Sequence, residues 1–191
     1  GTRRSRRSGL LERNAVSPPL EIERRYLLSG LPDLPPGTVS ASIEQGYVDR
    51  DAGPPIRFRR QTDPDGTVCT RTVKTGSGLV RTEEESEITA EAFDSAWVET
   101  EGRRIRKVRY AVPGPERWVV DAFSSLDLHL AEIELEAPDQ QPIIPEWLAP
   151  VLVREVTEDH RYTSYAVAHS GRPPEEGPNL RGARDPKPLF D

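Results

Sequence analysis

The sequence contains one cysteine, few aromatic residues and no long apolar run. Cys69 alone cannot form an internal disulfide, and this usage is typical of proteins from a reducing compartment. A membrane span needs about 18 consecutive apolar residues, and no such run occurs. The N-terminal residues also lack the apolar stretch of a secretory signal peptide. We therefore expect a cytoplasmic protein with no membrane partner.

Positive charge and apolar residues are both in short supply. The 191 residues include 26 Lys and Arg against 32 Asp and Glu, a net charge of -6, which argues against a specific nucleic-acid partner. Of the residues, 35% are hydrophobic and 30% are charged. This balance predicts a thin core or an unusually polar interior. The length suits one domain with irregular ends, or at most two small domains.

Composition divides the chain into three parts. Residues 1–19 carry five arginines against one glutamate. They could form an arm for a polyanion, but their low hydrophobicity favours a flexible leader. Residues 171–191 are rich in proline, glycine and charge, and we expect a flexible tail there. Residues 20–170 remain as the domain.

Clusters of proline and glycine divide the domain into short segments. Alternating patterns predict eight strands, over residues 20–28, 39–48, 56–61, 67–74, 79–89, 103–112, 117–123 and 130–137. A helix is predicted over 89–100, with Thr89 as its N-cap, and helical turns over 145–156 and 158–170. About eight strands to three helices indicates an α+β fold with an antiparallel sheet.

Charged residues recur at alternate positions in these strands. In LEIERRYLL (20–28), Glu21, Glu23 and Arg25 share one face, because successive side chains of a strand face opposite ways. The acids predicted on this face are Glu21, Glu23, Glu83, Glu85, Asp121, Glu132 and Glu134. The bases predicted there are Arg25, Arg57, Arg59, Lys74, Arg81, Lys107 and Arg109.

Two interpretations of this charged face remain. An antiparallel sheet often has one solvated face with ordinary ion pairs. However, acids and bases are sorted by strand here, whereas a merely solvated face would mix charges along each strand. Burying so many charges costs several kcal/mol for each unpaired ion. A hydrated channel that holds phosphates on arginines and Mg²⁺ or Mn²⁺ on carboxylates explains the pattern better.

These residues resemble the signature of the CYTH superfamily, the triphosphate tunnel metalloenzymes. The E-x-E-x-K motif of that family stands here as Glu21-Ile22-Glu23-Arg24-Arg25. Further matching segments follow in order: IEQGY (43–47), IRFRRQ (56–61), TVK (72–74), R-x-E-x-E (81–85), EGRRIRKVRY (101–110), VDAF (120–123), EIELE (132–136) and REVTEDHRY (154–162). The short form resembles bacterial inorganic triphosphatases, and the resemblance spans nearly the whole domain.

The resemblance implies an eight-stranded antiparallel β-barrel, a charged tunnel open at both ends, with a few helices packed outside. By position it makes Glu21, Glu23, Glu132 and Glu134 metal ligands, with Glu83, Glu85 and Asp121 as further candidates for Mg²⁺ or Mn²⁺. The implied phosphate-binding residues are Arg57, Arg59, Lys74, Arg81, Lys107 and Arg109. The implied reaction is metal-dependent hydrolysis of inorganic triphosphate to phosphate and pyrophosphate.

The sequence departs from the family at Arg25, where relatives usually carry a lysine that pairs with a tyrosine, here Tyr47. A guanidinium stays protonated, so Arg25 can bind phosphate or orient water but cannot accept a proton. His160 also replaces a frequent lysine, and we expect an exposed histidine there. Arg25 and Tyr47 are therefore the expected catalytic pair.

Other functions stay open at this point. Arg25 is compatible with a module that binds polyphosphate or nucleoside triphosphates without turnover. Thiamine triphosphatase and class IV adenylyl cyclase share the same scaffold. The glycine-serine-glycine segment at 76–78 lacks the pattern of a phosphate-binding loop, and His129, His160 and His169 lack metal-ligand spacing. The expected partner is a small triphosphate, and a homodimer is possible.

Overall fold

The computed structural model describes residues 20–77 and 80–174. The predicted leader (1–19) and residues 175–191 of the predicted tail lie outside these ranges, as do Gly78 and Leu79. Within the described part, no helix combines the length and the apolar character needed to cross a membrane.

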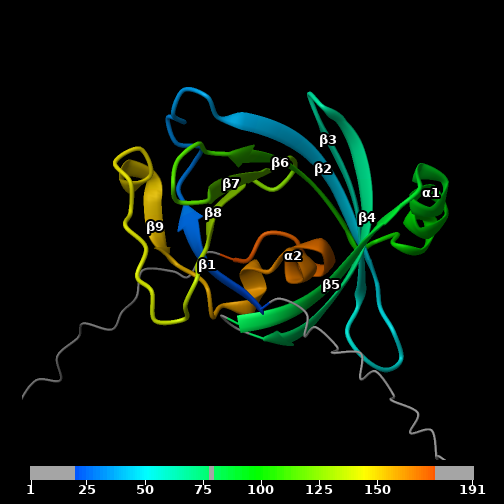
Figure 1. Cartoon of the computed structure of the whole chain (residues 1–191). Helices are drawn as coiled ribbons and strands as arrows, with labels where there is room; N and C mark the ends of the chain where they lie inside the picture. The colour runs from blue at the N-terminus through cyan, green and yellow to red at the C-terminus, as the bar shows by residue number, and fades with distance from the viewer. Residues whose placement is uncertain (1–19, 78–79, 175–191) are drawn as a thin grey trace, which may run out of the picture.

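In the described residues, nine antiparallel strands form a single curved sheet (Figure 1). They are β1 (Leu20–Leu28), β2 (Val39–Val48), β3 (Ile56–Asp63), β4 (Gly66–Ser77), β5 (Val80–Ile88), β6 (Arg104–Ala111), β7 (Trp118–Phe123), β8 (Leu128–Glu134) and β9 (Leu152–Glu155). Their order is β5-β4-β3-β2-β6-β7-β8-β1-β9. The start of β1 also pairs with the start of β5, where Glu21 lies opposite Arg81.

The eight predicted strands and the α+β class are confirmed, but the ninth strand corrects the prediction. Sequence analysis expects helical turns over 145–156, whereas residues 152–155 form β9 and the 3-10 helix η1 (Ala149–Val151) precedes it. Pairing with β5 covers β1 over Leu20–Ile22. Beyond this point the edge of β1 would expose unpaired backbone groups, and β9 pairs with it over Tyr26–Leu28.

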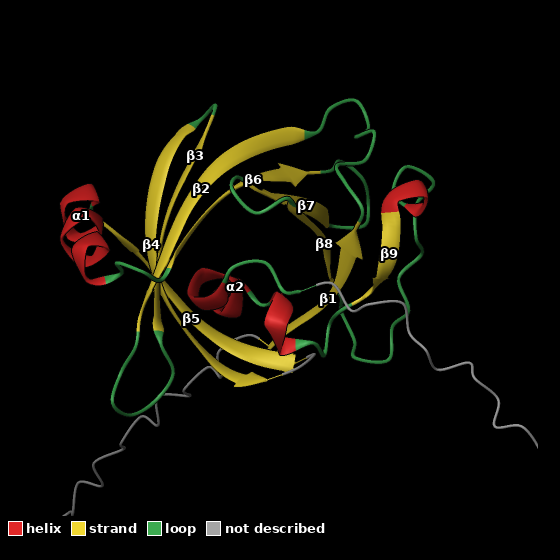
Figure 2. Cartoon of the chain, turned by 180° about the vertical axis from the view of Figure 1, so that it is seen from behind, coloured by secondary structure: helices red, strands yellow, loops and turns green. Residues whose placement is uncertain are grey.

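The two α-helices lie on opposite faces of the sheet (Figure 2). We call the face that carries Tyr47, Arg57 and Asp121 the inner face, because the sheet curves around it. Helix α1 (Ala90–Glu99) begins at the predicted N-cap Thr89 and packs outside, where its fully buried Phe93 lies 4.2 Å from the Arg60 guanidinium.

Helix α2 (Ser164–Ser170) follows the 3-10 helix η2 (His160–Tyr162) and lies against the inner face. The ring of Tyr165 meets the edge of the Tyr47 ring, with centroids 5.2 Å apart. The prediction that the helices pack outside is therefore correct for α1 and wrong for α2. An amphipathic pattern identifies the buried side of a helix, but not the face of the sheet that receives it.

The apolar core is divided between the two faces of the sheet. On the outer face, Tyr26, Trp118 and Leu148 belong to one buried cluster. On the inner face, Phe123 and Leu130 pack with Val167 of α2 in a second cluster. The remaining inner face is free of large apolar clusters among the described residues and carries the charged side chains.

Candidate functional site

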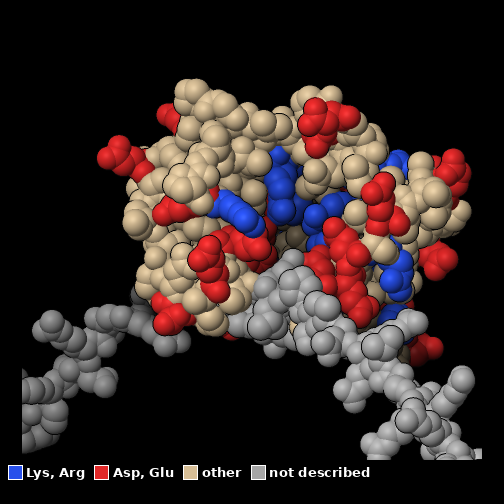
Figure 3. Space-filling view, in the orientation of Figure 1, with Lys and Arg blue, Asp and Glu red and all other residues tan. Residues whose placement is uncertain are grey.

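The register of the sheet brings the predicted charged residues together on the inner face. Arg57 lies opposite Tyr47 of β2 and Thr72 of β4, and Arg59 lies opposite Gln45. Figure 3 shows Lys and Arg side chains in the central hollow of the face viewed, with Asp and Glu side chains beside them. The sequence therefore predicted correctly which side of these strands carries the charges.

Arg25 joins two carboxylates on neighbouring strands. Its Nε donates to Glu132 Oε1 at 2.8 Å, and its Nη2 donates to Glu23 Oε1 at 2.6 Å. The Arg25 side chain is buried, and its backbone N–H donates to Thr157 Oγ1 at 3.1 Å. Burial opposes the charged form of Arg25, but Glu132 and Glu23 outweigh it and raise the pKa of the guanidinium.

Asp121 lies between two cations and is almost completely buried. Lys107 Nζ donates to Asp121 Oδ2 at 2.6 Å, while Arg109 donates to both carboxylate oxygens at 2.7 Å. Arg109 Nη2 also donates to Glu132 Oε2 at 2.8 Å, so this group connects with the Arg25 contacts. Both oxygens of Asp121 are thus engaged by cations, and its expected role as a metal ligand stays a prediction.

Burial and neighbouring charges shift the pKa values in this group. Burial is the main cause that lowers the pKa of Lys107 to about 8, against the attraction of Asp121. Burial favours the protonated form of Asp121 and of Glu132, but their cationic partners outweigh it. Arg109 and Lys107 lower the pKa of Asp121, and Arg25 and Arg109 hold the pKa of Glu132 well below its usual range.

A second group of contacts surrounds Arg57. Its Nη2 donates to Glu83 Oε1 at 2.7 Å, to Glu85 Oε2 at 2.9 Å and to Thr72 Oγ1 at 2.9 Å. Lys74 Nζ reaches the other oxygen of Glu83 at 2.7 Å. The Nε of Arg57 is buried and makes no hydrogen bond within the described residues. One donor of Arg57 is therefore left without a partner among the described residues.

Arg59 differs from the other inner-face cations because its hydrogen-bond partner is neutral. Its Nε donates to Gln45 Oε1 at 3.0 Å, and no carboxylate of the described residues contacts it. Burial, then the like charges of Arg57 and Arg109, lower the pKa of Arg59 to about 10. A cation without a carboxylate partner is suited to binding an anionic group.

The expected catalytic residues Arg25 and Tyr47 are hydrogen-bonded to different partners. Arg25 donates to Glu23 and Glu132, whereas the Tyr47 hydroxyl accepts from Gln45 Nε2 at 2.7 Å. Burial raises the pKa of Tyr47, and the charges of Arg57 and Arg59 oppose this shift. No hydrogen bond joins Arg25 and Tyr47 within the described part of the chain.

One predicted residue, Glu134, lies apart from these groups, and two others have side chains that the structure does not describe. The Glu134 side chain is 56% exposed and pairs with Arg117 at 3.2 Å, although its backbone lies opposite Glu23. The side chains of Glu21 and Arg81 lie outside the described residues.

Sequence reasoning missed two polar residues of the inner face. Gln45 and Thr72 are both fully buried, and both hold arginines. Alternation was a usable signal for both: Thr72 is two residues before Lys74 on β4, and Gln45 is two residues before Tyr47 on β2 and therefore shares its face.

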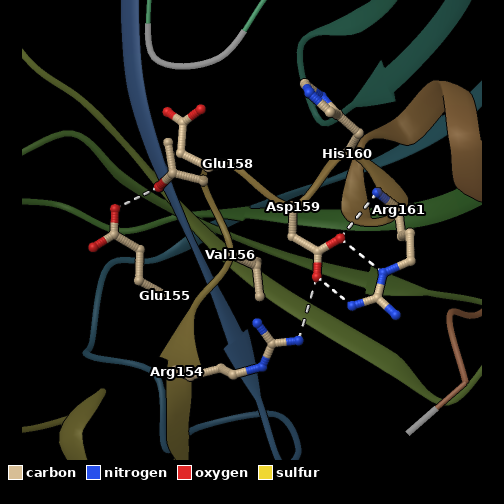
Figure 4. A pocket seen from close by; sticks show the side chains of 8 residues that line it. Arg154, Glu155, Val156, Glu158, Asp159, His160 and Arg161 are labelled. Atoms are coloured by element: carbon tan, nitrogen blue, oxygen red, sulfur yellow. Dashed lines mark hydrogen bonds and ion pairs between the residues drawn. The ribbon is translucent and has the colours of Figure 1, made fainter. Parts of the chain in front are cut away.

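A separate pocket of about 780 Å³ is lined by residues 154–161. Asp159 lies between Arg154 and Arg161 and pairs with both, at 3.4 and 2.7 Å, while His160 points away from them (Figure 4). His160 is exposed, as predicted. Because none of the predicted site residues lines this pocket, the inner face remains the candidate site.

Comparison with known proteins identifies relatives of the whole domain. No protein-family model matches the chain. An inorganic triphosphatase of Nitrosomonas europaea is 36% identical over 158 residues, which cover 78% of this chain and 97% of that protein. A crystal structure of the inorganic triphosphatase NE1496 superposes with a TM-score of 0.57 at 32% identity, covering 80% of this chain and 100% of its own. A second crystal structure of NE1496 superposes with a TM-score of 0.54 at 34% identity, covering 78% of this chain and 98% of its own. The chain therefore belongs to the inorganic triphosphatase family, which its motifs resemble.

Proposed function

We propose that this protein hydrolyses inorganic triphosphate to phosphate and pyrophosphate. The observation that carries the proposal is Arg59, an inner-face cation whose hydrogen-bond partner is the neutral Gln45 and on which Arg57 and Arg109 act as like charges. A ligand with several adjacent negative charges relieves the repulsion among these three side chains. Tripolyphosphate has that charge distribution, and a relative of this chain is named an inorganic triphosphatase.

The proposed site is a tunnel enclosed by eight strands. Two observations support this architecture: β1 pairs with β5 over Leu20–Ile22, and the charged side chains face the side around which the sheet curves. A tunnel restricts water near the ligand and strengthens each charge–charge interaction. Arginines on β3 and β6 would bind the phosphate oxygens and hold the chain of phosphates for attack by water.

Mg²⁺ or Mn²⁺ is the proposed cofactor, with Glu21, Glu23, Glu132 and Glu134 as its proposed ligands. Further candidates are Glu83, Glu85 and Asp121. No group of three or more acids, histidines or cysteines among the described residues lies close enough to hold a metal ion. The donor chemistry fits nevertheless, because Glu23 and Glu132 already share one cation, Arg25. A bound divalent ion would polarise a phosphoryl oxygen and neutralise developing charge.

The same residues suggest a role for Arg25. Its guanidinium keeps its protons, because Glu132 and Glu23 raise its pKa further. Arg25 therefore cannot act as a base; it can position a carboxylate, a phosphate oxygen or a water molecule.

A binding module is the second candidate, and Arg25 is the observation that favours it. If turnover requires a proton acceptor at this position, the chain binds a triphosphate without hydrolysing it. The acidic pair Glu23 and Glu132 favours the hydrolase, because an anion-binding module has no need for carboxylates beside its cations.

The test is phosphate release from tripolyphosphate, ATP and thiamine triphosphate, each with Mg²⁺, Mn²⁺ or EDTA. We expect metal-dependent release that is fastest with tripolyphosphate and lost in Glu132→Gln. Glu44→Gln is the matched control, because Glu44 pairs with Arg60 and Arg106 on the outer face. Melting temperatures of both variants check that each is folded.

Two other results would separate the candidates. A rise in melting temperature with tripolyphosphate, but no release of phosphate, would support the binding module. Neither binding nor release with any of the three compounds would contradict both functions.

A further inference from the structure

Gln45 is a neutral side chain at the centre of the charged inner face. It lies on β2, opposite Arg59 of β3 and Ile105 of β6, and it is fully buried. A buried amide must satisfy its donors and its acceptor locally, because water does not reach them. Gln45 does so with two functional candidates, Arg59 and Tyr47.

The direction of these two hydrogen bonds follows from the chemistry of arginine. A guanidinium has donors and no acceptor, so the group of Gln45 that faces Arg59 Nε is the carbonyl oxygen Oε1, at 3.0 Å. The amide nitrogen Nε2 then faces the Tyr47 hydroxyl at 2.7 Å and donates to its oxygen. The Tyr47 O–H hydrogen consequently points away from Gln45.

Among the described residues, no group accepts this hydrogen of the Tyr47 hydroxyl. The charged groups that act most strongly on it are Arg57, Arg59 and Arg25, and arginines cannot accept a hydrogen bond. Within the described residues, the hydroxyl makes no hydrogen bond other than the one from Gln45. An oxyanion that enters between these arginines would supply the missing acceptor.

We propose that Gln45 is a positioning residue: it orients Arg59 and makes Tyr47 a hydrogen-bond donor to a phosphate oxygen of the bound triphosphate. This inference rests on the proposed function. Gln45 itself touches neither the ligand nor the metal. Its contribution is to fix the direction of two hydrogen-bond donors, the Arg59 guanidinium and the Tyr47 hydroxyl. A polyanion can then accept hydrogen bonds from both without further reorganisation of the site.

Gln45→Glu tests the direction of the Tyr47 hydrogen bond with little change of shape. A carboxylate only accepts, so Tyr47 would donate to Glu at position 45 and would no longer donate to the ligand. Calorimetry in EDTA measures the affinity of the full chain for tripolyphosphate. Four proteins are compared: the wild type and Gln45→Glu, each with and without Tyr47→Phe. In the wild-type background we expect Tyr47→Phe to weaken binding about tenfold, the size of a hydrogen bond to a charged group. In the Gln45→Glu background we expect Tyr47→Phe to change binding less than about twofold.

Gln45→Met provides the second variant, with similar volume and no hydrogen bonds. Tyr47 keeps its hydrogen for the ligand in this variant, so Tyr47→Phe should still weaken binding. Equal effects of Tyr47→Phe in the wild-type and Gln45→Glu backgrounds would overturn the inference. An affinity of Gln45→Met for tripolyphosphate equal to that of the wild type would also overturn the inference. This second variant provides the test if Gln45→Glu does not fold. Failure of the wild-type protein to bind or hydrolyse tripolyphosphate would instead overturn the proposed function.

Discussion

The buried Lys107 makes the stability of this protein depend on pH in an unusual direction. Burial lowers the pKa of Lys107 to about 8 in the native state, against 10.5 for an ordinary lysine. Between these values the unfolded chain holds more protons at this position than the folded chain. Stability therefore increases as the pH rises from about 8 to about 10.5. A lysine whose pKa is raised by a partner has the opposite effect: its contribution to stability decreases as the pH rises.

The size of the effect follows from the two pKa values. At 1.36 kcal/mol for each pKa unit, the difference between about 8 and 10.5 corresponds to about 3 kcal/mol. Lys107→Met removes this dependence and leaves Asp121 with its two hydrogen bonds from Arg109. Asp121→Asn, by contrast, leaves both Lys107 and Arg109 without their shared carboxylate and should cost about 3–5 kcal/mol.

Urea unfolding at intervals from pH 7 to pH 10.5 measures the effect as a difference between wild type and Lys107→Met. Other groups that titrate in this range are common to both proteins, and those that do not interact with Lys107 cancel in the difference. We expect the free energy of unfolding of the wild type, relative to that of Lys107→Met, to increase by about 3 kcal/mol from pH 7 to pH 10.5. If the difference in unfolding free energy between the two proteins stayed constant over this range, burial would not lower the pKa of Lys107, and the reasoning would be refuted.

Two further predictions concern packing and a surface carboxylate. Gly46→Ala would place a Cβ 2.6 Å from the Cβ and Oγ1 of the fully buried Thr100. This overlap should destabilise the protein by about 1–3 kcal/mol. Gly30→Ala is the control, because its Cβ meets no atom within 4 Å and should not change the melting temperature. Hydrogen bonds from Arg161 lower the pKa of Asp159 to about 2, so Asp159→Asn should cost less than about 1 kcal/mol at pH 7. That difference should disappear as the pH falls from about 4 to about 2, and its persistence at pH 2 would contradict this assignment.

Alternation predicted the inner face well because it is a local property of each strand. Glu23 and Arg25 on β1, and Arg57 and Arg59 on β3, share the inner face as their spacing requires. The pairing of acids with bases across strands was not predictable, since it depends on register. Arg57 reaches Glu83 and Glu85 because β4 and β5 bring those residues alongside, and no short segment records that arrangement.

The missed elements depend on contacts between distant segments. Strand β9 forms because β1 leaves an edge unpaired, and the residues of LVRE have no helical or strand pattern long enough to indicate it. The position of α2 on the inner face depends on Tyr47, which lies more than a hundred residues before Tyr165. Gln45 was overlooked because its neighbours on the same face of β2, Ile43 and Tyr47, are uncharged, and only the register with β3 brings it opposite Arg59.

Two adjacent arginines on β3 allow a direct test of whether the inner face binds a polyanion. Arg59 faces inward with a neutral partner, whereas Arg60 faces outward and pairs with Glu44 and Asp94. Calorimetry with tripolyphosphate in EDTA compares the wild type with Arg59→Gln and Arg60→Gln. We predict at least about tenfold weaker binding for Arg59→Gln, from the loss of a charge-assisted contact, and no more than about twofold change for Arg60→Gln. Equal affinities for the wild type and Arg59→Gln would contradict the account.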